Sequence, residues 1–299
     1  MPNSCKQKAG PFYGIVGVIT LLLITIITFI PIFLIGIFKL VPNQKWRMQC
    51  AKGIDQMVSL WTGLTASYVK RFCKIHWNIS GNPQFDRKQW YLVIANHQSW
   101  LDIVILQHFF HDKIPVLKFF IKDQLKWVPL FNFAWWVMGC PFMKRYSKEY
   151  LEKHPQKKGQ DLKAAQKALK LFKSYPSSII SFVEGTRFTP QKQLQQQSPY
   201  LHLLKPKAGG ISQVIGGMGH QLQSILDVTI VYNNPNHSIW KMLCRYAQSV
   251  NVNVRLIPIP QLYTSGDSSF EDSYTQNTFR AWLNDQWMFK DTLIDKLKA

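Results

Sequence analysis

The chain opens with a long apolar segment, which sets the first expectation about the fold. Residues 10–38 contain no charged side chain. A helix needs roughly 20 apolar residues to cross hydrocarbon about 30 Å thick, so this segment is long enough to span a membrane. A cleaved signal peptide has a shorter apolar core of about 7–15 residues that ends at small residues, whereas Lys39 follows here. We therefore predict a retained membrane anchor over residues 1–43, either a span or a re-entrant helix pair, because Pro31 and Gly36 interrupt the run.

The next segment, residues 44–84, alternates apolar and basic positions. Its apolar side chains recur at near-helical spacing, which predicts an amphipathic helix at the membrane interface, followed by a linker. Packing against a protein core would produce the same stripe, which comprises Met57, Leu60, Trp61, Leu64 and Tyr68. The spacing alone leaves both explanations open.

From Trp90 onward, short β-rich runs alternate with helical stretches. Such alternation is typical of an α/β domain, so residues 85–299 are predicted to form a single domain with a central β-sheet flanked by helices. The expected strands are residues 91–95, 177–183, 226–232 and 250–259. A helix is expected over residues 159–174, where apolar positions recur at helical spacing, and a surface loop over the glutamine-rich residues 191–198.

The net charge of the chain indicates which class of binding partner to expect. Thirty-six Lys and Arg residues against sixteen Asp and Glu residues give a formal net charge of +20, which favours a polyanionic partner. Nucleic acid and an anionic membrane surface both fit, and the apolar N-terminal segment favours the membrane, so no nucleic acid is expected. More basic residues follow the apolar run than precede it, which predicts that the large C-terminal part faces the cytoplasm at the cell (inner) membrane. A basic nucleic-acid-binding membrane protein is the non-enzymatic alternative.

Cysteine and histidine usage indicates neither a disulfide framework nor a metal site. The five cysteines are scattered and form no CxxC pair, which suggests reduced thiols. His108, His111 and Asp112 lie close together in the sequence, but their spacing fits no zinc ligand set. We therefore expect no metal.

The segment NHQSWLD offers the first candidate chemistry. Asn96 and His97 follow a predicted strand, and Asp102 falls in the first turn of the next helix, where α/β proteins expose reactive groups. A histidine suits the role of general base, and a carboxylate on its other ring nitrogen would orient it. Two alternatives are open. Ser99 and Asp102 also match a helix-capping box, and Ser99 beside a base would be a nucleophile, although no G-x-S-x-G elbow surrounds it.

Two further segments offer sites for an anion. The segment FVEGTRF places residues 184–187 directly after a predicted strand. Gly185 permits a sharp turn, and the side chains of Thr186 and Arg187 donate hydrogen bonds that suit phosphate oxygens. Arg145 in GCPFMKR adds a guanidinium that can bind phosphate with two hydrogen bonds. A surface turn with a solvated Glu–Arg pair is the alternative for the first segment, and an ordinary basic run is the alternative for the second.

Together and in this order, these segments resemble the glycerolipid acyltransferase family that includes the 1-acyl-glycerol-3-phosphate acyltransferases, also described as PlsC-like. The first motif of that family, Asn-His followed by an Asp after four intervening residues, matches Asn96, His97 and Asp102. The second motif, Gly-x-x-Phe-x-x-Arg, matches residues 139–145. The third, Glu-Gly-Thr-Arg, matches residues 184–187 without substitution.

The remaining part of the resemblance is weaker. The fourth block of the family, a proline in a hydrophobic setting, falls at LLKPKAGGI and includes Lys205 and Pro206. The segment LDVTIVY, residues 226–232, looks like the Asp-Val-Thr segment of a subgroup that contains the bacterial YihG-like acyltransferases. The resemblance runs from residue 85 to residue 235.

The resemblance implies an acyltransferase in which His97 is the base and Asp102 orients it. Arg145 and Arg187 would hold the phosphate of the acceptor. The other motif residues would contribute to substrate binding, namely Asn96, Glu184, Gly185, Thr186, Lys205 and Pro206. The acyl donor would be acyl-CoA or acyl carrier protein, with no further cofactor, and the acceptor would be 1-acyl-glycerol-3-phosphate. Acylation of another lysophospholipid class and hydrolysis of the thioester are the enzymatic alternatives.

A second apolar stretch, residues 127–143, is of marginal length for a membrane span, and Pro129 interrupts it. A single crossing there would place the segments around His97 and Glu184 on opposite sides of the membrane. Because the resemblance requires these segments to act together, we predict a buried or interfacial element. Its aromatic side chains suit either core packing or a groove for an acyl chain.

Overall fold

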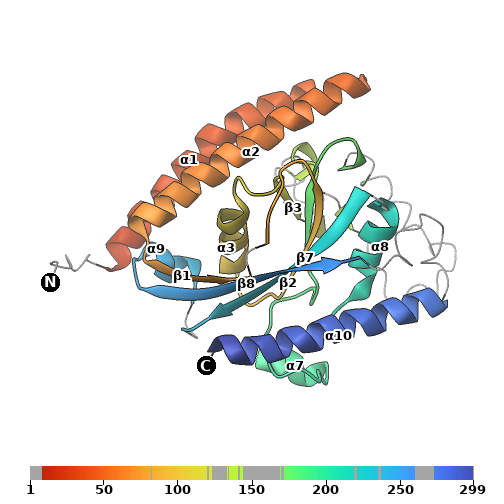
Figure 1. Cartoon of the computed structure of the whole chain (residues 1–299). Helices are drawn as coiled ribbons and strands as arrows, with labels where there is room; N and C mark the ends of the chain where they lie inside the picture. Colours follow the sequence, from red (N-terminus) through yellow and green to blue (C-terminus); the bar gives the residue numbers. More distant parts are fainter. Residues whose placement is uncertain are drawn as a thin grey trace.

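The computed structural model shows a central β-sheet with helices on both faces (Figure 1). It describes residues 9–81, 83–119, 121–122, 133, 135–140, 142–143, 169, 172–218, 221–234, 237–259 and 273–298. Helices α1 (Pro11–Phe38) and α2 (Gln44–Phe72) lie side by side over one face. Helices α8 (Ala208–Met218) and α10 (Ser273–Lys298) cover the other face. The predicted α/β class, with its N-terminal apolar helix, is confirmed.

The main sheet has six strands in the order β1-β8-β7-β2-β6-β3. Their bounds in that order are Ile75–Ser80, Gln248–Pro258, Leu222–Tyr232, Trp90–Ala95, Ser178–Phe182 and Leu117–Phe119. Strands β3, β6, β2 and β7 run parallel, whereas β8 is antiparallel to β7, and β1 is parallel to β8. All four strands expected from the sequence are present. In addition, β1 joins the sheet from within the segment expected to contain a linker, and β4 (Ile121–Lys122) pairs separately with β5 (Phe142–Met143).

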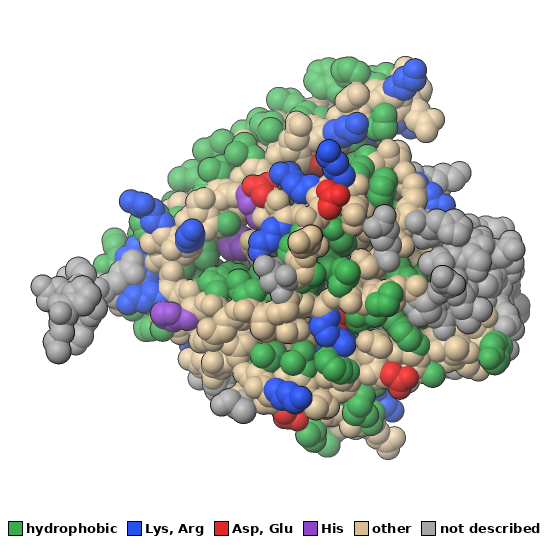
Figure 2. Space-filling view, viewed as in Figure 1, with side chains coloured by type: hydrophobic (Ala, Val, Ile, Leu, Met, Phe, Trp, Pro, Cys, Tyr) green, Lys and Arg blue, Asp and Glu red, His purple; other side chains and the backbone are tan. Residues whose placement is uncertain are grey.

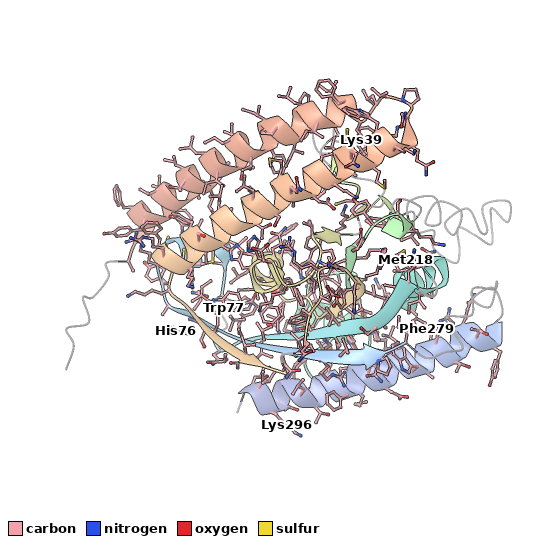
Figure 3. All side chains as sticks on the ribbon, turned by 45° about the horizontal axis from the view of Figure 1, so that its top comes forward. Lys39, His76, Trp77, Met218, Phe279 and Lys296 are labelled. Carbon is pink, nitrogen blue, oxygen red and sulfur yellow. The ribbon has the colours of Figure 1, made fainter. Side chains whose placement is uncertain are left out.

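Strand β2 lies inside the sheet, and all its residues after Trp90 are buried. Its sequence, WYLVIA, is apolar on both faces, as expected for a parallel strand that helices cover on both sides. On one face, α3 (Leu101–Phe110) packs between the sheet and α2. On the other face, α8 and α10 form a second apolar cluster with the sheet, and Figure 3 marks two of its members, Met218 and Phe279.

Buried charges align α10 with the sheet. The ammonium group of Lys290 is fully buried, 2.6 Å from one carboxylate oxygen of Asp227 and 2.6 Å from the carbonyl oxygen of Val228. Arg255 on β8 binds the other carboxylate oxygen of Asp227 at 2.6 Å. Because an unpaired buried charge is costly, these contacts favour one position of α10 against β7 and β8.

Both ends of α1 contact the domain. At its start, the backbone N–H of Gly10 donates to the carbonyl of Cys244, just after α9 (Ile239–Leu243), at 2.9 Å. Near its end, a Cβ atom on Gly36 would lie 2.5 Å from Val137, so glycine is what permits this close approach. The length of α1 therefore runs along the domain rather than away from it.

The outer side of α1 is apolar and exposed (Figure 2). Within the described residues, α1 is the one helix that is long and apolar enough to cross a membrane, judged by length and composition alone. Only 11% of its most apolar 18-residue window is buried. Its exposed large side chains include Phe12, Ile15, Ile19, Leu22, Leu23, Ile26, Ile27, Ile30, Phe33, Leu34 and Phe38.

Helix α2 links α1 to the domain. The side chain of Asn43 caps its first turn by accepting the N–H of Trp46 at 3.0 Å. Further along, Asp55 accepts from the buried ammonium group of Lys118 on β3 at 2.9 Å, and the same ammonium group donates to Tyr175 at 2.8 Å. These polar contacts position α2 on the sheet side of α1.

One local prediction was wrong. Residues Pro190–Gln195 form a short helix, α7, which overlaps the glutamine-rich segment 191–198 that was expected to be a loop. The hydroxyl oxygen of Thr189 accepts the N–H of Lys192 at 3.2 Å, and Pro190 occupies the first helical position, where its missing N–H costs nothing. Within the segment 127–143, residues 133, 135–140 and 142–143 are described, and Val137 and Cys140 among them are buried. Most of the segment 159–174 lies outside the described residues.

Candidate active site

The candidate site lies at the edge of the sheet where the parallel strands end. The segments that contain His97 and Glu184 leave the carboxyl ends of β2 and β6, which are neighbours in the sheet. Strand β7, on the other side of β2, ends at Tyr232 on the same edge. The two loops touch directly, because the N–H of Phe188 donates to the carbonyl of His97 at 2.7 Å. Ligands commonly bind at this edge of α/β sheets.

His97 and Asp102 form a hydrogen-bonded pair. Nδ1 of His97 lies 2.8 Å from Oδ2 of Asp102, whose side chain is fully buried. An ionised carboxylate only accepts hydrogen bonds, so the pairing assigns the proton to Nδ1. That tautomer leaves Nε2 with a free lone pair. The imidazole is partly exposed, with 13% of its surface accessible, and it can act as a base toward a bound ligand.

Asp102 has three further hydrogen-bond partners. Oδ2 accepts the backbone N–H groups of Gln98 at 2.6 Å and of Ser99 at 2.8 Å, which caps the start of α3. Oδ1 accepts the hydroxyl of Tyr232 at 2.7 Å. Capping the helix and orienting the histidine were open alternatives in the sequence, and the structure contains both contacts.

Two neighbouring side chains hold the loop of His97. The ring of Phe182 stacks on the imidazole, with centroids 4.0 Å apart and planes at 15°. Asn96 is fully buried, and its amide accepts the N–H of Ile230 at 2.8 Å and donates to the carbonyl of the same residue at 2.9 Å. This amide extends the contact between β2 and β7 past Ala95, and it faces protein rather than solvent.

Glu184 joins the loops around the site. Its buried carboxylate accepts the N–H of His97 at 2.8 Å on one oxygen and the N–H of Leu204 at 2.9 Å on the other. Burial raises the pKa of Glu184 from 4.5 to about 7, and the two N–H donors oppose part of that rise. Gly185 follows with a φ of 70°, in the left-handed region that favours glycine.

Thr186 and Arg187 follow Gly185 and place a hydroxyl group and a guanidinium group beside this turn. Arg187 is exposed, and its guanidinium carbon lies 5.1 Å from the centre of the Trp100 ring. Stacking on an aromatic ring orients a guanidinium without using its N–H donors. The ammonium group of Lys192, on α7, donates to the hydroxyl oxygen of Thr186 at 2.8 Å and to the carbonyl of Arg187 at 3.0 Å. This group of side chains suits an anion.

The other expected substrate-binding residues have different surroundings. Lys205 is exposed and Pro206 partly buried, and both line an open cleft against Arg280 and Met288 of α10. The N–H of Lys207 donates to the carbonyl of Val183 at 2.9 Å, so this block lies directly beside the turn at residues 184–187. Arg145 lies outside the described residues, and its contact with phosphate stays a prediction.

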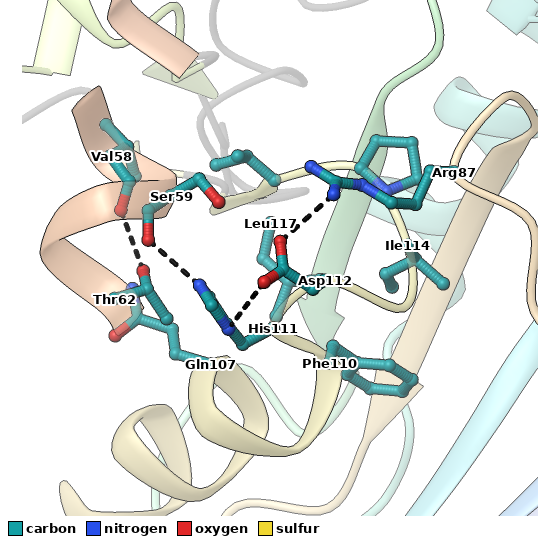
Figure 4. A pocket seen from close by; sticks show the side chains of 12 residues that line it. Val58, Ser59, Thr62, Arg87, Gln107, Phe110, His111, Asp112, Ile114 and Leu117 are labelled. Atoms are coloured by element: carbon teal, nitrogen blue, oxygen red, sulfur yellow. Dashed lines mark hydrogen bonds and ion pairs between the residues drawn. The ribbon is translucent and has the colours of Figure 1, made fainter. Parts of the chain in front are cut away.

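The histidine cluster noted in the sequence lies at the C-terminal end of α3, where His111 and Asp112 follow the helix (Figure 4), whereas His97 precedes its start. Nε2 of His111 is 3.0 Å from the carbonyl oxygen of Ser59 on α2. Asp112 pairs with His111 at 3.3 Å and with Arg87 at 3.0 Å. Through His111, these contacts join the end of α3 to α2, so this cluster stabilises the packing of the two helices.

Residues 76–232 match a protein-family model described as Acyltransferase. That region is more than half of the 299-residue chain, and it contains the loops after β2 and β6. The fold and the site thus define an α/β acyltransferase domain. The chain belongs to the acyltransferase family, and its relatives agree with the PlsC-like resemblance of the sequence motifs.

Relatives of known description agree with this assignment. Mouse 1-acyl-sn-glycerol-3-phosphate acyltransferase epsilon is 25% identical over 226 residues, which cover 68% of this chain and 56% of the mouse protein. The protein 1-acyl-sn-glycerol-3-phosphate acyltransferase 2 from Arabidopsis thaliana is 26% identical over 234 residues, which cover 72% of this chain and 54% of the Arabidopsis protein. This chain therefore spans little more than half the length of these relatives. The YihG-like subgroup stays a prediction.

Among solved structures, the crystal structure of PlsC, the 1-acyl-sn-glycerophosphate acyltransferase from Thermotoga maritima, aligns with this chain. It is 17% identical, with a TM-score of 0.46, and the match covers 91% of this chain and 97% of that one.

Several residues of the site had no signal in the sequence. Phe182 and Tyr232 read as ordinary strand residues, and Lys192 lay in a segment expected to be a loop. Tyr232 acquires its partner only through the fold, since Asp102 lies 130 residues away in the sequence. Alternation along the predicted strand 226–232 would have placed Tyr232 on a particular face, but not beside a carboxylate.

The buried carboxylate of Glu184 is expected to make folding stability depend on pH. Its pKa is raised from 4.5 to about 7, so the native state binds a proton more tightly than the unfolded chain. The resulting stabilisation is present below pH 4.5 and is lost as pH rises through 7, by roughly 3 kcal/mol in total. Glu184→Gln cannot ionise, so denaturant unfolding in detergent should show a shallower decline over that window.

Asp285→Asn is the matched control, because Asp285 is an exposed carboxylate on α10. It should retain the wild-type pH dependence. Equal slopes for wild type and Glu184→Gln would contradict the assignment of this titration to Glu184.

Proposed function

We propose that the protein transfers a fatty acyl group from acyl-CoA or acyl carrier protein to a hydroxyl of a lysophospholipid, with 1-acyl-glycerol-3-phosphate as the acceptor. The observation that carries this proposal is the 2.8 Å contact between His97 and Asp102, adjacent to the cationic turn at residues 186–187. Family membership supports the reaction class. The descriptions of the mouse and Arabidopsis relatives support the acceptor.

The proposed reaction needs one base and one proton path. Nε2 of His97 removes the hydroxyl proton as the acceptor oxygen attacks the thioester carbonyl, forming a tetrahedral oxyanion. Collapse of the oxyanion breaks the C–S bond, and the imidazolium returns the proton to the leaving thiolate. The products are the acylated lipid and the free thiol. Asp102 stabilises the imidazolium between the two proton transfers.

The acceptor phosphate is assigned to the turn beside this pair. Arg187 can donate two N–H groups to phosphate oxygens while its plane rests on Trp100. The oxygen of Thr186 already accepts from Lys192, which leaves its hydroxyl hydrogen available to a ligand. The predicted contribution of Arg145 would add to this group.

We also propose that α1 and α2 attach the domain to the cytoplasmic face of the cell (inner) membrane. Helix α1 has 28 residues and is about 42 Å long, and both its ends contact the same domain. A helix held in this way fits one leaflet, lying along the surface with its apolar side in the lipid. The basic residues on α2 would then face anionic headgroups.

Replacement of the base should abolish most of the activity. General base catalysis contributes typically 10²–10⁴-fold, so His97→Ala should lower kcat by about that factor. The measurement is transfer of labelled oleoyl-CoA to a panel of lysophospholipids by detergent-solubilised protein. His202→Ala, at an exposed pair with Asp295 on α10, is the matched histidine control and should keep wild-type kcat. Wild-type rates in folded His97→Ala would refute the dyad, and free fatty acid without acylated lipid would favour thioester hydrolysis.

Replacement of the proposed phosphate ligand should weaken acceptor binding. Removal of charge-assisted hydrogen bonds in Arg187→Ala should raise the KM for 1-acyl-glycerol-3-phosphate roughly 10- to 100-fold, with donor KM unchanged. Arg187→Lys keeps the charge but loses the paired geometry, so an intermediate KM is expected. A change confined to the donor KM would count against this assignment.

Labelling from each side of the membrane should distinguish an in-plane helix from a span. Cys5 precedes α1, and Lys45→Cys adds a thiol after it, at an exposed position of α2. The four cysteines in the described residues are buried and should react slowly. A membrane-impermeant maleimide should label both probes in inside-out vesicles and neither in sealed right-side-out vesicles. Labelling of the two probes from opposite sides would show a span, and Cys5→Ser gives the background.

A further inference from the structure

Asp102 presents two oxygen atoms, and the proposed chemistry of His97 uses one of them. Oδ2 lies 2.8 Å from Nδ1 of His97 and also accepts two backbone N–H groups. Oδ1 accepts the hydroxyl of Tyr232 at 2.7 Å. In the part of the chain that the structure describes, this hydroxyl is the one hydrogen-bond donor to Oδ1.

Tyr232 is buried beside the carboxylate of Asp102. It is the last residue of β7, and 7% of its surface is exposed. Alternation along the strand places it on the same face as Val228 and Ile230, toward α3. The ring of His237 stacks on the phenol at 3.9 Å, with planes at 10°. Burial raises the pKa of Tyr232 well above its ordinary value, so the phenol stays protonated and donates.

We propose that Tyr232 is a positioning residue for the base: its hydroxyl holds the carboxylate of Asp102 and limits the negative charge presented to His97. A carboxylate that loses a hydrogen-bond donor becomes more basic. It then favours the protonated imidazolium more strongly, and the carboxylate is also less firmly oriented. The effect of Tyr232 on turnover rests on the proposed acyl transfer, whereas its effect on the titration of His97 does not.

Titratable groups from the neighbouring strands and loops surround the His97–Asp102 pair. Among the described residues, Glu184 after β6 and Tyr232 at the end of β7 interact electrostatically with Asp102, and His237 stacks on Tyr232. Among the residues that the structure describes, Tyr232 alone donates a hydrogen bond to Oδ1 of Asp102, so a substitution there changes the carboxylate without removing a charge from the site.

The first test measures the titration of His97 without turnover. Diethyl pyrocarbonate modifies neutral imidazole, and mass spectrometry of the His97 peptide gives the modification rate at each pH. In Tyr232→Phe, the midpoint of this curve should rise by roughly 0.5–1 pH unit. Tyr91→Phe is the control, because Tyr91 is also buried, on β2, and its hydroxyl accepts the N–H of Asp86, away from His97. The control should keep the wild-type midpoint.

A second variant strengthens the hydrogen bond from residue 232 to Asp102, which Tyr232→Phe removes. Incorporation of 3-fluorotyrosine at position 232 keeps the hydroxyl and makes it a stronger donor. The midpoint should then fall below the wild-type value. A role limited to packing would not reverse the sign, and this variant retains the ring if Tyr232→Phe proves unstable. An unchanged midpoint in the folded 3-fluorotyrosine protein would overturn the proposal, as would a rise.

Kinetics provide the final comparison. In Tyr232→Phe, kcat should fall roughly 10- to 100-fold with little change in KM, and the acidic limb of the kcat/KM profile should move to higher pH. A lower kcat with an unmoved limb would mean a structural role only. Absence of acyl transfer in the wild-type protein would refute the proposed function, while the modification experiment would still decide the role of Tyr232.

Discussion

The buried carboxylate of Asp102 is the interaction on which the geometry of the site depends. A carboxylate removed from water is costly unless hydrogen bonds replace its hydration. Here four donors do so, from the imidazole of His97, two N–H groups of the following loop, and the hydroxyl of Tyr232. The same contacts hold the loop at the start of α3, assign the proton of the imidazole and join α3 to the end of β7. The hydrogen bonds that stabilise the buried charge of Asp102 therefore also orient His97.

On the other face of the sheet, a buried carboxylate is likewise paired with hydrogen-bond donors. Asp227 points away from α3 on β7, and its buried carboxylate is matched by Lys290 of α10 and by Arg255 of β8. Glu184 is matched by backbone N–H groups from two loops, and the indole of Trp287 donates to the carbonyl of Leu204 at 3.0 Å. Through these contacts, α10 supports the block that holds the Glu184 turn. The C-terminal helix is thus part of the framework of the site, although it contributes no residue to the dyad.

The N-terminal helix pair has two surfaces with different physical roles. Its inner side is joined to the domain by specific contacts, including the pair between Asp55 and the buried Lys118. Its outer side exposes large apolar side chains along α1 (Figure 2). Because both ends of α1 are attached to the domain, insertion of that apolar side into lipid would also orient the carboxyl edge of the sheet relative to the membrane. A membrane anchor of this kind would position the site as well as retain the protein.

The sequence by itself determined the class of fold and the identity of the main chemical groups. Period-two and helical patterns are local, so the strands at β2, β6, β7 and β8 were predictable, and the spacing of His97 and Asp102 spans a single loop and helical turn. Partners distant in the sequence were not predictable. The pairing of Tyr232 with Asp102 and the burial of Glu184 between loops depend on strand order and helix packing. Tertiary structure decided these contacts because it sets which local segments share an edge and which polar groups lose water.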